Sequence, residues 1–208
     1  MKLKLLNIDG GKSETIEISD KVINLKVNHK LIKYVIDWQL NHAKPRTAKT
    51  KQKNEIRGST KKIVAQKGSG GARHASRKAP IFVGGGVAHG PKGELAYKKR
   101  KLNKSEKKLS IASLITEKNK LNNLIIFSDF TNEIKKTKEM HLIIKKFEIT
   151  NSLIILDKTS KEKIQKSTKN IPNVKVTDVN HFSAFDIIKF KKVVFTESSI
   201  KELEKRYS

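Results

Sequence analysis

A regular alternation of short apolar runs and helical patterns fills the second half of this 208-residue chain. The apolar runs are rich in Ile and Val and cover Leu124–Phe127, Ser152–Leu156, Val174–Thr177 and Val193–Phe195. Helical patterns separate or follow them at Lys136–Ile149, Lys161–Lys169, Ala184–Ile188 and Ile200–Lys205. Because short buried strands alternating with helices build βαβ units, the pattern predicts an α/β fold with a mainly parallel sheet flanked by helices on both faces.

The N-terminal residues extend this fold. Lys2–Ile8 and Glu14–Ile18 alternate as strands do, and Asp9-Gly10-Gly11 between them indicates a turn. Asn28–His42 is predicted to be a helix. Its apolar face comprises Leu31, Val35 and Trp38, so we expect the single tryptophan to pack in the core.

A further helix is expected after residue 104. Ser105 is placed where an N-cap would be, and an apolar stripe follows at Leu109, Ala112, Leu114 and Ile115. The flanks 1–43 and 105–208 are therefore assigned to one discontinuous α/β domain.

Residues 44–104 have a different composition. They hold 18 of the 46 Lys and Arg residues but only two acids, Glu55 and Glu94, and so carry +16 of the formal net charge of +26. Nine of the 11 glycines and three of the four prolines also lie here. Such an excess of positive charge favours a polyanionic partner, either nucleic acid or an anionic membrane surface.

The same segment is too poor in large apolar side chains to offset the entropy of ordering it, so we expect it to be a mobile, extended loop when free. A loop this long inside a compact domain is typically functional. Lys and Arg would neutralise phosphates, and the glycines would let the backbone approach them closely.

We assign phosphate contacts to two arms, an outgoing arm at 44–62 and a returning arm at 73–104, with a weakly charged tip between them. The predicted RNA-binding residues are Lys44, Arg46, Lys49, Lys51, Lys53, Arg57, Lys61, Lys62, Lys67, Arg73, His74, Arg77, Lys78, His89, Lys92, Lys98, Lys99, Arg100, Lys101 and Lys104. The predicted tip comprises Ile63, Val64, Ala65, Gln66, Lys67, Gly68, Ser69, Gly70 and Gly71.

Other kinds of site find little support. Gly85 and Gly90 have the spacing of a nucleotide-binding loop, but Pro91 stands where that loop requires Lys. The chain has no cysteine, and its six histidines lack metal-ligand spacing, so neither a cofactor nor a metal is expected. No apolar run is long enough to span a bilayer.

Three aspartates follow predicted strands. Asp129, Asp157 and Asp178 lie where α/β enzymes place catalytic carboxylates, which leaves open an RNA-acting enzyme that uses the loop as a substrate clamp. Helix capping and turns explain them equally well, and no nucleophile or base accompanies them. We favour a non-catalytic protein.

Several ordered motifs of the loop carry a resemblance to a known family. They are Arg57-Gly58-Ser59-Thr60-Lys61-Lys62, Gln66-Lys67-Gly68-Ser69-Gly70, Ala72-Arg73, Ala79-Pro80-Ile81-Phe82, Gly84-Gly85-Gly86-Val87-Ala88-His89-Gly90-Pro91, Leu102-Asn103-Lys104 and Leu109-Ser110-Ile111-Ala112-Ser113-Leu114. In these motifs, and in the order of its elements, the chain resembles the bacterial L-four family of large-subunit ribosomal proteins.

The resemblance implies a cytoplasmic, monomeric component of the ribosome with large-subunit rRNA and neighbouring ribosomal proteins as partners. It implies that the loop enters the RNA, that the protein aids subunit assembly, and that the tip lines part of the nascent-peptide exit tunnel. The tip departs from the family pattern. Ile63-Val64-Ala65 replaces the usual Pro-Trp-Arg, and Gly71 replaces an Arg, so the tip lacks an aromatic ring and two cations.

Overall fold

The computed structural model describes residues 2–7, 14–96, 99–130 and 132–207. The expected turn at Asp9-Gly10-Gly11 lies outside the described residues. The chain divides into two compact units, Met1–Leu40 with Lys101–Ser208, and Asn41–Arg100. We call the first unit the body and the second the loop unit.

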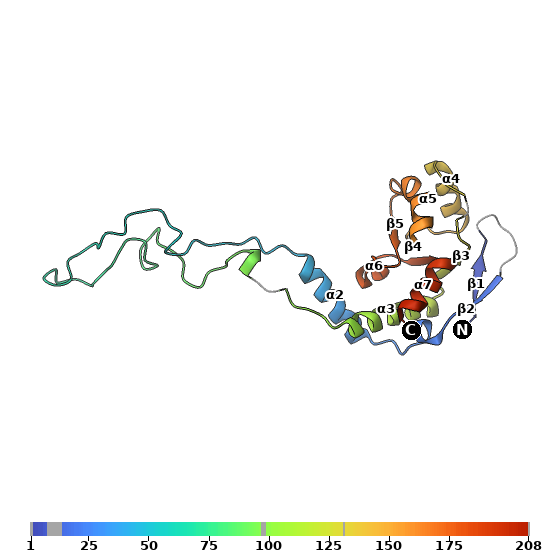
Figure 1. The fold of residues 1–208 in the computed structure, drawn as a ribbon, viewed down its shortest axis with the longest axis horizontal. Helices are drawn as coiled ribbons and strands as arrows, with labels where there is room; N and C mark the ends of the chain where they lie inside the picture. Colours follow the sequence, from blue (N-terminus) through green and yellow to red (C-terminus); the bar gives the residue numbers. More distant parts are fainter. Residues whose placement is uncertain (1, 8–13, 97–98, 131, 208) are drawn as a thin grey trace. The chain divides into compact units, whose positions relative to one another are not determined.

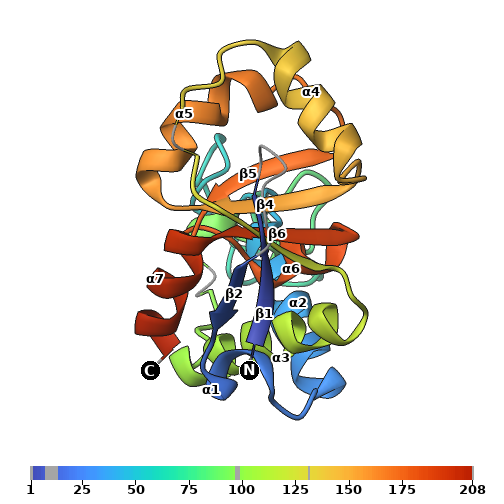
Figure 2. The same ribbon diagram turned by 90° about the vertical axis from the view of Figure 1, so that its right-hand side faces the viewer.

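The strands are β1 (Lys2–Leu6), β2 (Glu14–Glu17), β3 (Leu124–Phe127), β4 (Ser152–Leu156), β5 (Val174–Asp178) and β6 (Lys192–Thr196). The helices are α1 (Asp20–Ile23), α2 (His29–Ala43), α3 (Lys104–Lys120), α4 (Thr137–Lys146), α5 (Lys158–Thr168), α6 (Ala184–Lys189) and α7 (Glu197–Tyr207), with a 3₁₀ turn η1 at Glu94–Ala96. Figure 1 labels most of these elements along the chain, and Figure 2 also labels α1 and β6.

The described strands of the body form one six-stranded sheet in the order β2-β1-β3-β6-β4-β5. Every neighbouring pair is parallel except β1 and β2, which pair antiparallel. Figure 2 shows β6, β4 and β5 lying in succession across the sheet. The predicted α/β class with a mainly parallel sheet is confirmed.

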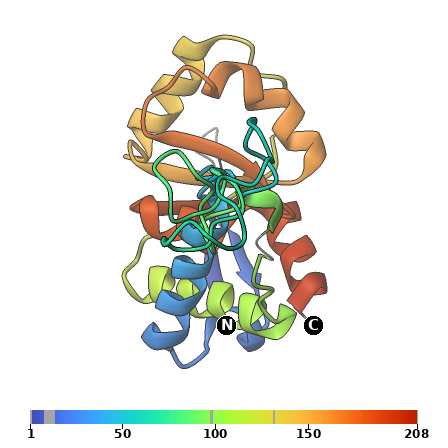
Figure 3. The same cartoon turned by 90° about the vertical axis from the view of Figure 1, so that its left-hand side faces the viewer.

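Successive residues of the central strands point to opposite faces of the sheet, and each face has its own core. Leu153 and Ile155 join the core beneath α1, α2, α3, α6 and α7, whereas Ile154 and Leu156 join the core beneath α4 and α5. The views in Figures 2 and 3 both show α4 and α5 on one side of the sheet and α3 and α7 on the other. Because β4 is covered on both faces, all five of its residues are buried and it reads as a continuous apolar run.

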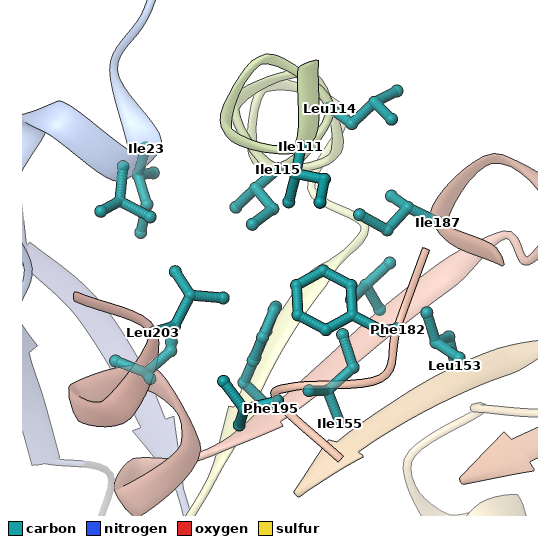
Figure 4. Packing of buried hydrophobic residues seen from close by; sticks show 14 of the residues in the cluster. Ile23, Ile111, Leu114, Ile115, Leu153, Ile155, Phe182, Ile187, Phe195 and Leu203 are labelled. Atoms are coloured by element: carbon teal, nitrogen blue, oxygen red, sulfur yellow. The ribbon is translucent and has the colours of Figure 1, made fainter. Parts of the chain in front are cut away.

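The larger core is centred on Phe195 of β6. In Figure 4, Ile111 and Ile115 of α3, Leu203 of α7 and Phe182 gather around it. The Phe182 and Phe195 rings meet edge to face with their centroids 6.5 Å apart. Each fully buried side chain of this size contributes about 1.5–3 kcal/mol to folding, and this burial fixes the body.

Two expectations about α3 are wrong. Ser105 is not the N-cap, because the helix begins at Lys104 after Asn103, whose side chain makes no capping hydrogen bond. Leu109 is 45% exposed, while Ser110 to Thr116 are all buried. The buried surface of α3 therefore includes small polar residues that an apolar stripe does not reveal. Trp38 is half-buried and packs against the larger core, as expected.

Candidate nucleic-acid interface

The two arms of the loop unit are joined by backbone hydrogen bonds. Thr50 N donates to Pro91 O over 2.8 Å, Gly93 N to Ala48 O over 2.9 Å, and Val87 N to Lys51 O over 2.9 Å. In Figure 1 the teal and green arms run alongside each other. The segment is therefore an internally bonded, two-armed structure, which its composition did not reveal.

The arms approach so closely that glycine is required between them. A Cβ at Gly86 would lie 2.3 Å from the backbone nitrogen of Lys53, and one at Gly90 would lie 2.1 Å from the Thr50 hydroxyl. No side chain fits at the first position without displacing backbone. These two glycines therefore serve the contact between the arms.

Pairing the arms places cationic residues at matching positions on the two strands of the loop. Lys49 and Lys92 are partners in an isolated antiparallel bridge. Like charges placed directly opposite are destabilising in a ladder, and an anion nearby would relieve the repulsion. This arrangement is typical of a surface that binds a polyanion.

The acids of the loop unit do little to offset this charge. Glu94 pairs with Lys99 over 2.9 Å, and the hydrogen bond and positive charge of Lys99 lower the pKa of Glu94. Glu55 accepts a local hydrogen bond from Gln52 N. Among the described Lys and Arg side chains from Lys44 to Arg100, all are exposed except Lys78, which is half-buried.

The returning arm contains a compact series of turns at Ser76–Gly86. Ala79 N donates to Ser76 O, Phe82 N to Ala79 O, and Gly86 N to Lys78 O. Ser76 is only 4% exposed. The half-buried His74 ring packs edge to face on Phe82, with ring centroids 5.0 Å apart. These turns therefore hold one of the predicted RNA-contacting histidines in place.

The tip begins beyond the hydrogen bond from Ile63 N to Ala75 O, which is 3.1 Å long. Lys62 donates from its ammonium to the Gln66 side chain. Gly68 and Gly70 have φ of 87° and 63°, in the region that favours glycine. Apart from the half-buried Val64, the predicted tip residues are exposed.

Most predicted RNA-binding residues lie in the loop unit. Lys101 and Lys104 instead belong to the body, and Lys98 lies outside the described residues. His89 is exposed and has a φ of 55°. Thr50, Gly86 and Gly90 shape the contact between the arms, and their role could not be predicted because it depends on contacts across the loop.

The three aspartates of the body act structurally. Asp157 caps α5 by accepting from Ser160 N. Burial raises the pKa of Asp157, but hydrogen bonds from Thr159 and Ser160 outweigh this effect and leave the pKa below its usual value.

The other two aspartates also have local partners. Asp129 accepts from Ser198 N over 3.1 Å, in the first turn of α7. Asp178 pairs with Lys161 over 2.8 Å. Both carboxylates therefore connect neighbouring elements of the body.

Within the described ranges, no three His, Asp or Glu side chains come together as metal ligands would. Among the same residues, no helix has the length and apolar character needed to cross a membrane. An α/β body joined to an exposed cationic two-armed loop is typical of proteins that hold structured nucleic acid.

Comparison with known proteins defines the family. The Ribosomal protein L4/L1 family profile matches residues 16–206. The chain is 80% identical over its full length to the large ribosomal subunit protein uL4 of Pelagibacter ubique, with all of both chains covered. The proteins of the same name from Treponema denticola and Fervidobacterium nodosum are 33% and 35% identical, over 100% and 98% of this chain and 97% of each relative.

The chain belongs to the ribosomal protein L4/L1 family. It is a structural ribosomal protein of the large subunit, a cytoplasmic particle in bacteria, and not an enzyme. This membership rules out the alternative of an RNA-acting enzyme, and it confirms the resemblance noted in the sequence.

Proposed function

We propose that this protein binds large-subunit rRNA through residues 44–104, and that this binding aids assembly of the subunit. The observation that carries the proposal is the pairing of two exposed cationic arms, with Lys49 directly opposite Lys92. The segment carries a net charge of +16, and its two acids, Glu55 and Glu94, cannot neutralise this charge. The phosphates of folded rRNA supply the negative charge that is needed.

The hydrogen bonds between the arms make such binding more favourable. Hydrogen bonds such as that from Thr50 N to Pro91 O restrict the backbone of the free protein. Less conformational entropy is therefore lost when RNA binds. Phosphates would then contact the exposed ammonium and guanidinium groups on both arms. Each neutralised phosphate releases counterions, so affinity should fall steeply with salt.

The tip has a separate proposed role, in which it lines part of the nascent-peptide exit tunnel beside neighbouring ribosomal proteins. The support is its position between the arms and its small, exposed, weakly charged residues around Gly68–Gly71. Ile63-Val64-Ala65 presents aliphatic rather than aromatic surface. Here the tip would contact its neighbours by packing, without ring stacking.

The test is a titration of the full-length protein with large-subunit rRNA at several salt concentrations. If about ten cations contact phosphates, the logarithm of the affinity should fall with the logarithm of salt with a slope of roughly −7 to −9. Small-subunit rRNA serves as the competitor. A shallow slope, or equal affinity for both RNAs, would contradict the proposal.

A further inference from the structure

An open pocket of about 500 Å³, here called the cavity, lies within the loop unit, between the outgoing arm and the turns of the returning arm at Arg77–Gly84. Its size falls in the range of small-molecule sites, roughly 300–1,000 Å³. Its lining comprises Ile56, Arg57, Gly58, Ser59, Lys61, Lys62, Ile63, Arg77, Lys78, Val83 and Gly84. The cations are predicted from the amino-acid sequence, whereas the concave surface that they surround is not.

The lining combines two kinds of chemistry. Five of its residues are cations and none is acidic. Within the part of the chain that the structure describes, none of these five forms an ion pair with a carboxylate. Ile56, Ile63 and Val83 add apolar surface to the same cavity.

Binding to a phosphate backbone alone does not use the aliphatic side chains of this cavity. A purely apolar protein segment, in turn, would not use its five positive charges. A nucleotide satisfies both, because it joins a flat base to an anionic phosphate. Arginine suits such a ligand, since its guanidinium plane can stack on a base or bind a phosphate with two hydrogen bonds.

The walls of the cavity are held by the backbone. Ile63 N bonds to Ala75 O, and Gly86 N bonds to Lys78 O over 2.9 Å. Lys61 N donates to the Ser59 hydroxyl over 3.1 Å, which shapes the turn on the outgoing side. The hollow is therefore built by contacts that the free protein already makes.

We propose that this cavity receives one unpaired nucleotide of the bound RNA, with the base against the aliphatic side chains and its phosphate among the cations. The inference rests on the proposed function and adds to it a specific recognition site. It distinguishes this part of the loop from the arms near Lys49 and Lys92, which would contact the phosphate backbone without selecting a base.

The first test locates the RNA at the cavity by crosslinking. The chain has no cysteine, so Val83→Cys and Ile81→Cys each provide a unique attachment point for a photoactivatable group. Both positions are exposed on the same arm, Val83 at 108% and Ile81 at 69%, but only Val83 stands at the rim of the cavity. With large-subunit rRNA, the probe at 83 should mark one unpaired nucleotide, whereas the probe at 81 should mark several. Equal, scattered marking from both positions would overturn the proposal.

The second test places a bulky side chain at the rim of the cavity without changing charge. Val83→Trp should weaken RNA binding by about tenfold, the order of magnitude lost when one base loses its stacking surface, and should leave the salt slope unchanged. Ile81→Trp is the matched control and should bind as wild type does. Chemical probing should show that the same single nucleotide becomes reactive only with Val83→Trp. Wild-type affinity and protection with Val83→Trp would contradict the assignment.

These outcomes are separable from failure of the proposed function. If wild-type protein does not bind large-subunit rRNA, both proposals fall. If it binds with a steep salt slope and Val83→Trp changes nothing, only the nucleotide site is wrong. Adenosine monophosphate at millimolar concentration tests a free nucleotide as the source. If Val83→Trp abolished the binding of adenosine monophosphate but left RNA binding unaltered, the cavity would be a small-molecule site, and the RNA assignment would be overturned.

Discussion

Lys49 and Lys92 face each other as partners in an antiparallel bridge, and Thr50 N next to them donates to Pro91 O over 2.8 Å. The backbone pairing thus places two exposed cationic residues at matching positions on the two arms. This relationship connects the fold of the loop to its proposed role, because an anion can interact with both arms at this point.

Neutralising this pair should weaken RNA binding almost uniformly across sequences. The double change Lys49→Gln and Lys92→Gln removes two phosphate contacts, so the salt slope should become shallower by about 2. The measurement is the salt dependence of affinity for large-subunit rRNA. Lys138→Gln with Lys145→Gln on α4 removes the same charge from the body and should change the slope much less. Equal effects of the two double variants would contradict a loop-centred interface.

Gly86→Ala should disrupt the pairing of the arms without any change in charge. The added Cβ would meet the backbone nitrogen of Lys53 at 2.3 Å, so one arm must shift. We expect RNA affinity to fall while the urea unfolding of the body stays as in wild type. Gly71→Ala is the control, because its nearest neighbour would lie 4.0 Å away. Unaltered affinity with Gly86→Ala would show that the arms bind independently of their pairing.

Asp157→Ala should reduce the free energy of unfolding of the body by about 1 kcal/mol, through loss of the α5 cap. The pKa of Asp157 is below its usual value in the folded state. Its charged form therefore contributes stability above about pH 4, and this contribution is lost as pH falls through the folded pKa. Urea unfolding at pH 7 and pH 3 measures both effects. Asp157→Asn can keep the cap, but its stability should lack this pH dependence. If the stability of Asp157→Asn depended on pH as that of wild type does, another group would be responsible for the effect.

Tyr207 should make the body sensitive to alkali. Burial raises the pKa of Tyr207 to about 12, against the opposing charge of Arg206. The unfolded chain releases this proton near pH 10, so stability falls as pH rises between about 10 and 12. Comparing the unfolding of wild type and Tyr207→Phe across this range isolates the effect. Identical pH dependence of the two proteins would show that Tyr207 ionises normally in the fold.

Much of the body could be predicted from the sequence, because its local patterns agree with its tertiary contacts. The runs at Leu124–Phe127 and Ser152–Leu156 coincide with β3 and β4, since buried parallel strands need continuous apolar residues. The start of α3 was harder to predict. Asn103 precedes the helix without a capping hydrogen bond from its side chain, so it gives no clear start signal. Nearer the C-terminal end of α3, Thr116 is buried, and its hydroxyl donates to Ala112 O, a helix-internal bond that an apolar stripe does not encode.

The candidate site was predictable in charge but not in form. Cations such as Arg57 and Lys78 stand out by composition, since few acids accompany them. The bonds between 48–51 and 87–93 join backbone atoms far apart in sequence and leave no side-chain pattern. Val83 could not be predicted as a site residue from the sequence, because it is an isolated aliphatic residue in a glycine-rich loop. Only the structure shows that it lines the cavity.

The central claim is that residues 44–104 carry the interaction with the large subunit. Co-sedimentation with large ribosomal subunits at raised salt tests it most directly, comparing wild type with a chain lacking Lys49–Lys98. The deletion removes the paired arms but leaves the α/β core of the body, so circular dichroism should still report a folded protein. We predict that wild type is retained in the particle and that the deleted chain is not. Normal retention of the deleted chain would contradict the account.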